Sequence, residues 1–170
     1  MNKYRKLVTV LAVLLVFGVF LWIARPVANS GDNTPAIGGG PTATSVLSAT
    51  EGSYDFGSIS MAKGKVTHVF KVKNIGDREV KINKLYTSCM CTSASLLTAG
   101  GKQGPFGMPG HAAIPRIDTP LASGGEAEVE VVFDPAAHGP AGVGRIERKI
   151  MLENDGGATL AIAISATVTP

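Results

Sequence analysis

Alternation of apolar and polar residues with a period of two is the feature that most constrains the fold of this chain. In residues 126–133 (EAEVEVVF), three glutamates alternate with apolar side chains. Residues 158–168 (ATLAIAISATV) alternate large aliphatic side chains with small or polar ones in the same way. Because successive side chains of a strand point to opposite faces, such segments form strands with one buried face. No segment after residue 24 has helical periodicity, so the sequence predicts an all-β domain.

Further strands are indicated by the same alternation or by β-branched and aromatic content. They are expected at residues 53–59, 65–74, 79–86, 112–117 and 145–152. Turn sequences rich in Gly, Asp, Asn and Pro separate them. About seven short strands in one domain predict an immunoglobulin-like antiparallel β-sandwich.

The N-terminus carries a membrane signal. Residues 1–6 are basic, and residues 7–24 (LVTVLAVLLVFGVFLWIA) contain no charge. Eighteen helical residues cover about 27 Å, close to the hydrocarbon thickness of a bilayer. The basic flank favours a cytoplasmic N-terminus, so we expect an uncleaved, single-pass signal anchor in the cell membrane, with the domain facing the periplasm or cell exterior. A cleaved signal peptide is the alternative, and either leaves the cysteines outside the cytoplasm.

Residues 25–45 are rich in Pro, Gly, Ser and Thr, which predicts a flexible linker. The folded domain is therefore expected to span residues 46–170. The net charge of +3 arises at the N-terminus, and basic and acidic side chains are equal in number from residue 46 onward. A neutral domain without a basic stripe argues against nucleic-acid binding.

The only two cysteines, Cys89 and Cys91, flank Met90 in the motif SCMCTSA. Three explanations remain open for this spacing: a metal site, a redox pair, or small buried residues at the end of a strand. His138, in AAHGPAG, is expected in an exposed turn. His68 is expected to be hydrogen-bonded at the core margin, and Asp134 to end a strand.

Several motifs together resemble the bacterial DUF1573 family. They are YDFGSI, THVFKVKNIGDREVKI, YTSCMCTSA, GGEAEVEVVFDP and ATLAIAISATV, in this order. The resemblance implies a sandwich related to ASPM, SPD-2 and hydin or major-sperm-protein domains, which bind other proteins, and it implies no activity. This chain departs from the family pattern in two places: Met90 stands where the family usually has glycine, and residues 97–114 form an insertion that is expected to enlarge a loop.

The insertion brings two more soft ligands near the cysteine motif in the sequence. Met108 and His111 lie in GPFGMPGH, and thiolate with thioether suits Cu(I) best. The predicted site would use Cys89, Cys91, Met108 and His111, with Met90 as an additional candidate. Zinc fits less well, because thioether is not among its usual ligands.

A redox role is the second alternative to simple protein binding. Oxidising compartments preserve disulfides, and a bridge between residues two apart is strained and easily reduced. Against this, the spacing is not C-x-x-C and no helix N-terminus is evident to lower a cysteine pKa. No hydrolase or phosphate-loop motif is present, so we do not expect an enzyme. The first expectation is a membrane-anchored binding or assembly module with a protein partner in the envelope.

Overall fold

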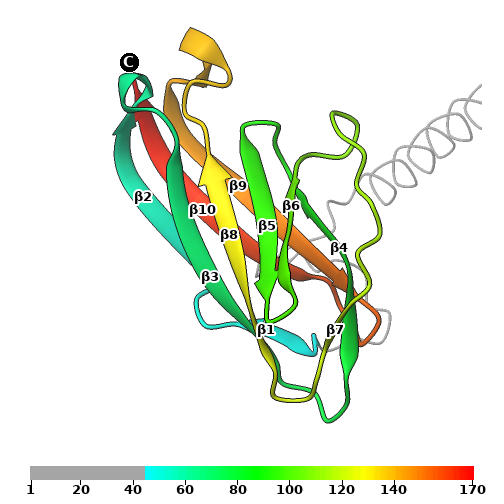
Figure 1. The fold of residues 1–170 in the computed structure, drawn as a ribbon. Helices are drawn as coiled ribbons and strands as arrows, with labels where there is room; N and C mark the ends of the chain where they lie inside the picture. The colour runs from blue at the N-terminus through cyan, green and yellow to red at the C-terminus, as the bar shows by residue number, and fades with distance from the viewer. Residues whose placement is uncertain (1–44) are drawn as a thin grey trace, which may run out of the picture. The chain divides into compact units, whose positions relative to one another are not determined.

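The computed structural model describes residues 45–170, which form a sandwich of two five-stranded sheets (Figure 1). The predicted cytoplasmic segment, signal anchor and nearly all of the linker lie outside these residues. Within the described part of the chain, we find no helix with the length and apolar character needed to cross a membrane.

The first sheet has the strand order β1-β3-β8-β5-β6. Its strands are β1 (Leu47–Ala49), β3 (Val66–Asn74), β8 (Glu126–Phe133), β5 (Thr92–Thr98) and β6 (Gly101–Phe106). The second sheet has the order β2-β10-β9-β4-β7. Its strands are β2 (Ser53–Ser60), β10 (Leu160–Thr169), β9 (Gly144–Asn154), β4 (Val80–Thr87) and β7 (Thr119–Leu121). Two short 3₁₀ helices, η1 (Met61–Lys63) and η2 (Gly139–Gly142), lie in connections.

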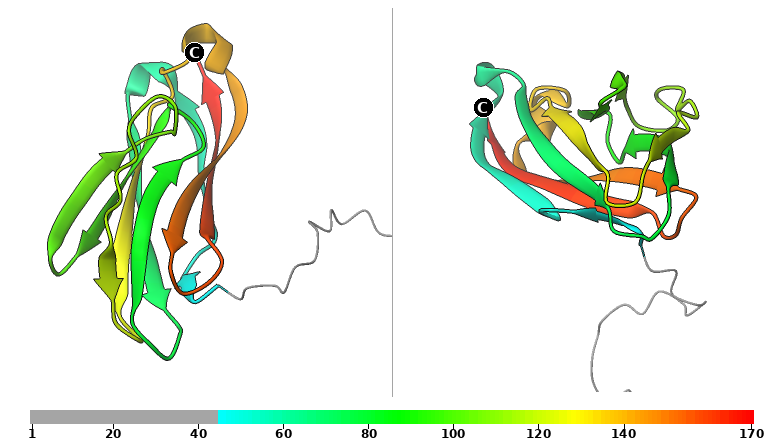
Figure 2. Two further views of the ribbon diagram at one scale, coloured as in Figure 1. Left: turned by 90° about the vertical axis from the view of Figure 1, so that its right-hand side faces the viewer. Right: turned by 60° about the horizontal axis from the view of Figure 1, so that its bottom comes forward.

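The core lies between the two sheets, which face each other in Figure 2. The predicted alternation is confirmed in β8, where Val129, Val131 and Phe133 are buried while Glu126 and Glu128 are exposed. In β10 the side chains buried from the other sheet are Ile162, Ile164, Ala166 and Val168. Each large side chain buried in this way contributes about 1.5–3 kcal/mol, so the paired inner faces hold the sheets together.

The all-β prediction is confirmed, but several details of the sequence reading were wrong. Residues 45–170 form ten strands instead of about seven, and β2 pairs with β10 in parallel. Residues 112–117 form no strand, and the short strand β7 follows them. The insertion at residues 97–114 is not simply a loop, since it contains the end of β5 and all of β6.

The missed strands have physical explanations. In β5, Ala94, Ser95 and Leu96 are buried in succession, and Gly104 of β6 lies against Ser95. A strand buried on both faces shows no alternation. The sequence of β6, GKQGPF, contains glycine and proline, which are tolerated at the edge position that it occupies.

The Y-D-F-G motif lies in β2 and shapes that edge strand. Asp55 Oδ1 accepts a hydrogen bond from the Gly57 amide at 2.9 Å, and Gly57 has φ +71°. The same carboxylate ion-pairs with Arg145 of β9 at 3.0 Å. The Gly57 amide and then Arg145 hold the pKa of Asp55 below its usual value. The Y-D-F-G motif therefore has a structural explanation in the described residues.

A redox and metal candidate site at one end of the sandwich

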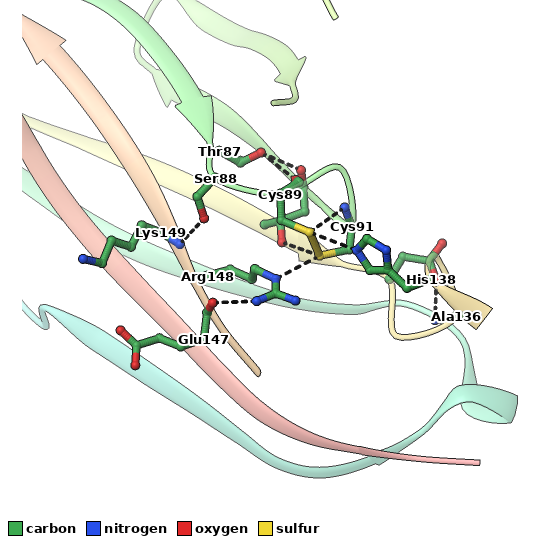
Figure 3. Close-up of a disulfide and its surroundings, with 11 residues drawn as sticks. Thr87, Ser88, Cys89, Cys91, Ala136, His138, Glu147, Arg148 and Lys149 are labelled. Atoms are coloured by element: carbon green, nitrogen blue, oxygen red, sulfur yellow. Dashed lines mark hydrogen bonds between the residues drawn. A yellow bond between two sulfur atoms is a disulfide. The ribbon is translucent and has the colours of Figure 1, made fainter. Parts of the chain in front are cut away.

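The turn between β4 and β5 contains a disulfide between Cys89 and Cys91 (Figure 3). Both sulfurs belong to buried residues, with exposed fractions of 7% for Cys89 and 3% for Cys91. Met90, which stands between them in the chain, is 52% exposed. The turn thus directs both cysteines inward and the methionine toward solvent.

Hydrogen bonds within the turn fix the position of the cysteines. The Thr92 amide donates to the Cys89 carbonyl at 3.1 Å, and the Cys91 amide donates to Cys89 Sγ at 3.2 Å. The buried Thr87 hydroxyl lies 3.0 Å from the Cys89 carbonyl and 2.9 Å from the Thr92 carbonyl. Its single hydrogen can serve either acceptor, so Thr87 holds both ends of the turn together.

Neighbouring strands from both sheets hold the turn from outside. The Ser88 amide donates to the Lys149 carbonyl of β9 at 2.9 Å, and Ser88 Oγ accepts from the Lys149 amide at 2.8 Å. On the other side, the Asp134 amide donates to the Cys91 carbonyl at 2.8 Å. These bonds bring β9 and the chain that leaves β8 next to the disulfide.

His138 approaches the disulfide from the connection between β8 and β9. Its Nε2 lies 3.2 Å from Cys89 Sγ, in hydrogen-bond contact (Figure 3). The two sulfurs and one ring nitrogen of His138 all lie within 4.8 Å of one another. The expectation that His138 lies in an exposed turn is confirmed, but the sequence analysis did not assign it to the site.

Arg148 approaches the other sulfur from β9, as Figure 3 shows. Its Nε donates to Cys91 Sγ at 3.3 Å, and its Nη1 donates to the Glu147 carbonyl at 2.8 Å. The Thr92 hydroxyl lies 3.7 Å from the same sulfur. Because the guanidinium is always protonated, Arg148 places a fixed positive charge beside Cys91.

A surface pocket adjoins the disulfide on the Cys89 side. Its lining residues are Ser88, Cys89, Met90, Met108, His111, His138, Glu147 and Arg148. The sequence-predicted candidates Met108 and His111 therefore lie in the same pocket as Cys89. The Thr87 amide donates to the Gly107 carbonyl at 3.0 Å, which brings the loop after β6 to this end of the sandwich. Cys91 does not line the pocket.

The other singled-out polar residues have structural roles. His68 Nε2 lies 2.6 Å from Glu51 Oε1, and its ring stacks on Tyr54 with centroids 3.6 Å apart. The prediction of a hydrogen-bonded histidine at the core margin is therefore confirmed. Asp134 Oδ1 accepts from the Ala136 amide at 2.9 Å, immediately after β8, as expected for a residue that ends a strand.

The domain is a two-sheet, immunoglobulin-like β-sandwich, and one end of it holds a buried disulfide beside a surface pocket. Residues 47–105, from β1 to β6, match the model of the DUF1573 family, described as a protein of unknown function. The resemblance is thereby confirmed over these residues, which contain the motifs YDFGSI, THVFKVKNIGDREVKI and YTSCMCTSA. No curated protein matches the chain.

Among solved structures, the chain is similar to a protein of unknown function from Porphyromonas gingivalis W83. The two share 16% identity with a TM-score of 0.51, over 80% of this chain and 51% of that one. This chain thus spans about half the length of that protein, and the similarity shows the fold alone. A PapD-like domain of human CEP192 gives 14% identity and a TM-score of 0.42, over 85% of this chain and 98% of that domain.

Proposed function

We propose that this protein is a membrane-tethered, extracytoplasmic domain whose Cys89–Cys91 disulfide exchanges with thiols of a partner. One observation carries the proposal: a side-chain nitrogen contacts each sulfur, His138 Nε2 at Cys89 and Arg148 Nε at Cys91. The apolar segment at residues 7–24 supports the tether and the oxidising location.

The two sulfurs have different roles in this proposal. Cys89 lines the surface pocket whereas Cys91 does not, so an incoming thiolate attacks Cys89 Sγ. The electron pair of the disulfide leaves on Cys91 Sγ, where the Arg148 guanidinium stabilises the thiolate and the Thr92 hydroxyl can donate to it. Exchange is faster when the leaving thiolate is stabilised. The arrangement therefore favours attack at Cys89 Sγ with Cys91 Sγ as the leaving group.

The complete reaction requires a dithiol reductant. The first thiolate of the reductant forms a mixed disulfide with Cys89. The second thiolate of the reductant then attacks the reductant sulfur in that mixed disulfide and releases the Cys89 thiolate. Two electrons and two protons pass to the cysteine pair, and the reductant becomes a disulfide. The broad expectation of an envelope protein partner thus narrows to a protein with a reactive dithiol.

The site of attack can be measured directly with a monothiol. The full chain, purified in detergent, is mixed with glutathione, quenched with excess N-ethylmaleimide, and digested with trypsin. Both cysteines lie in the peptide between Lys84 and Lys102, and fragment ions on either side of Met90 separate them. We expect glutathione on Cys89 and maleimide on Cys91, and two new thiols per chain after full reduction with a dithiol.

Two results would oppose the proposal. If native protein yields no thiols at dithiol concentrations that reduce a strained model disulfide, the bond is structural. If glutathione is found equally on both cysteines, the proposed difference between the two sulfurs is wrong. Circular dichroism before and after reduction is the control, because the rest of the core lies between two hydrogen-bonded sheets and we expect the spectrum to persist.

A further inference from the structure

The donors that gather around the disulfide are ligands of soft cations once the sulfurs are reduced. Thiolates favour Cu(I), and imidazole binds copper as well. We propose that the reduced protein binds one Cu(I) ion through Cys89 Sγ, Cys91 Sγ and His138 Nε2. This inference rests on the proposed function, since the disulfide must open before either sulfur can bind a metal.

The spacing of the three donors fits a single ion. All three atoms lie within 4.8 Å of one another, and hydrogen bonds hold in place the turn that carries the two cysteines. A metal–thiolate bond is about 2.3 Å long in zinc sites, so an ion placed among donors at this spacing is within bonding reach of each. Reduction breaks the bond between the two sulfurs, which leaves both cysteine side chains free to rotate toward the ion.

The charges at the site favour a monovalent cation. Two thiolates and one Cu(I) carry a net charge of −1, which the Arg148 guanidinium beside Cys91 Sγ balances. With Zn²⁺ the two thiolates would already be neutralised, so Arg148 would gain no opposite charge from the metal site. Glu147 also lines the pocket, but its carboxylate points away from the sulfurs in Figure 3.

The assignment of His138 changes the ligand set expected from the sequence. Met108 and His111 share the pocket, but it is His138 whose ring nitrogen contacts a cysteine sulfur. The two histidines form a matched pair, because both are exposed and both lie in connections that line the same pocket. Replacing each with alanine distinguishes the two ligand sets. In either set, both thiols lose their protons to solvent when Cu(I) binds.

The test uses the full chain in detergent, reduced with a phosphine and desalted without oxygen. Free thiols are counted first, and Cu(I) is then titrated in competition with bathocuproine disulfonate. We expect one Cu(I) per chain. The X-ray absorption spectrum of the bound copper should fit a coordination shell of two sulfur atoms and one nitrogen atom. His138→Ala should weaken Cu(I) binding at least about tenfold. Loss of a residue that only hydrogen-bonds to a metal ligand already lowers metal affinity about 10- to 100-fold, and loss of a ligand should cost no less. His111→Ala should change it less than twofold.

The controls separate failure of this inference from failure of the proposed function. Reduced protein alkylated at both thiols should bind no copper, as should the Cys89→Ser/Cys91→Ser variant, and the alkylated sample avoids any folding defect of that variant. Absence of thiols after reduction would overturn both proposals. Two thiols with no copper above the alkylated sample would overturn the metal site alone. If His111→Ala weakens binding as much as His138→Ala, the ligand set is wrong.

Discussion

Replacing Arg148 with methionine is expected to slow the reduction of the Cys89–Cys91 disulfide by glutathione about 10- to 100-fold. The Arg148 Nε–Cys91 Sγ contact at 3.3 Å becomes a charge-assisted hydrogen bond when Cys91 leaves as a thiolate. Hydrogen bonds to charged groups contribute about 1.5–3 kcal/mol, and about 1.4 kcal/mol corresponds to a factor of ten. Methionine keeps an unbranched side chain at the position and removes the donor and the charge. The rate of reduction is measured by alkylating samples at a series of times and counting the free thiols by mass spectrometry.

Arg145→Met is the matched control for this prediction. Arg145 lies on the same strand, β9, but its guanidinium contacts Asp55 and Ser165 instead of a sulfur. The control removes the same charge, so a general effect of net charge on the approach of anionic glutathione would slow both variants equally. Equal slowing would therefore count against a specific role of Arg148. A change in the rate of Arg148→Met alone supports it.

The sequence predicted the parts of the fold that depend on a single buried face. β3, β8, β9 and β10 each have a solvent-facing side, so their patterns of polar and apolar residues alternate. β5 could not be recognised in this way, because Ala94, Ser95 and Leu96 are buried in succession and leave no alternating pattern. The parallel pairing of β2 with β10 depends on contacts between the two ends of the domain, which no local pattern records.

The candidate site was predictable only in part, for a related reason. Cys89 and Cys91 were evident from their spacing, and Met108 and His111 from their position in the following segment. His138 and Arg148 reach the sulfurs only because Thr92 pairs with Phe133 and Ser88 bonds to Lys149. The one sequence feature that could have pointed to His138 as a site residue is its position shortly after the strand at residues 126–133. Which strand end lies beside the cysteines depends on the register between distant strands.

Replacing Asn74 with aspartate is expected to lower the free energy of unfolding by about 3 kcal/mol or more. Asn74 is fully buried at the end of β3, and its Nδ2 lies within 2.8–3.1 Å of the carbonyls of Arg78, Leu121 and Ala122. Its Oδ1 accepts from the Gly76 amide at 2.9 Å. Aspartate has nearly the same shape, but it offers no donor and places a carboxylate against three carbonyls. Each buried group left without a partner costs about 1–3 kcal/mol.

Asn83→Asp makes the same chemical change at a less buried site. The Asn83 side chain accepts a single hydrogen bond from Arg116 at 3.3 Å, so aspartate is tolerated there or strengthens that contact. Urea unfolding of the full chain, followed by circular dichroism, should show a lower midpoint for Asn74→Asp and little change for Asn83→Asp. The difference would disappear if Asn74 only filled space, because the two variants conserve volume equally. A stability loss confined to Asn74→Asp therefore identifies the hydrogen bonds donated by Asn74 Nδ2 as the link that joins the end of β3 to β7, and it explains why residue 74 is asparagine.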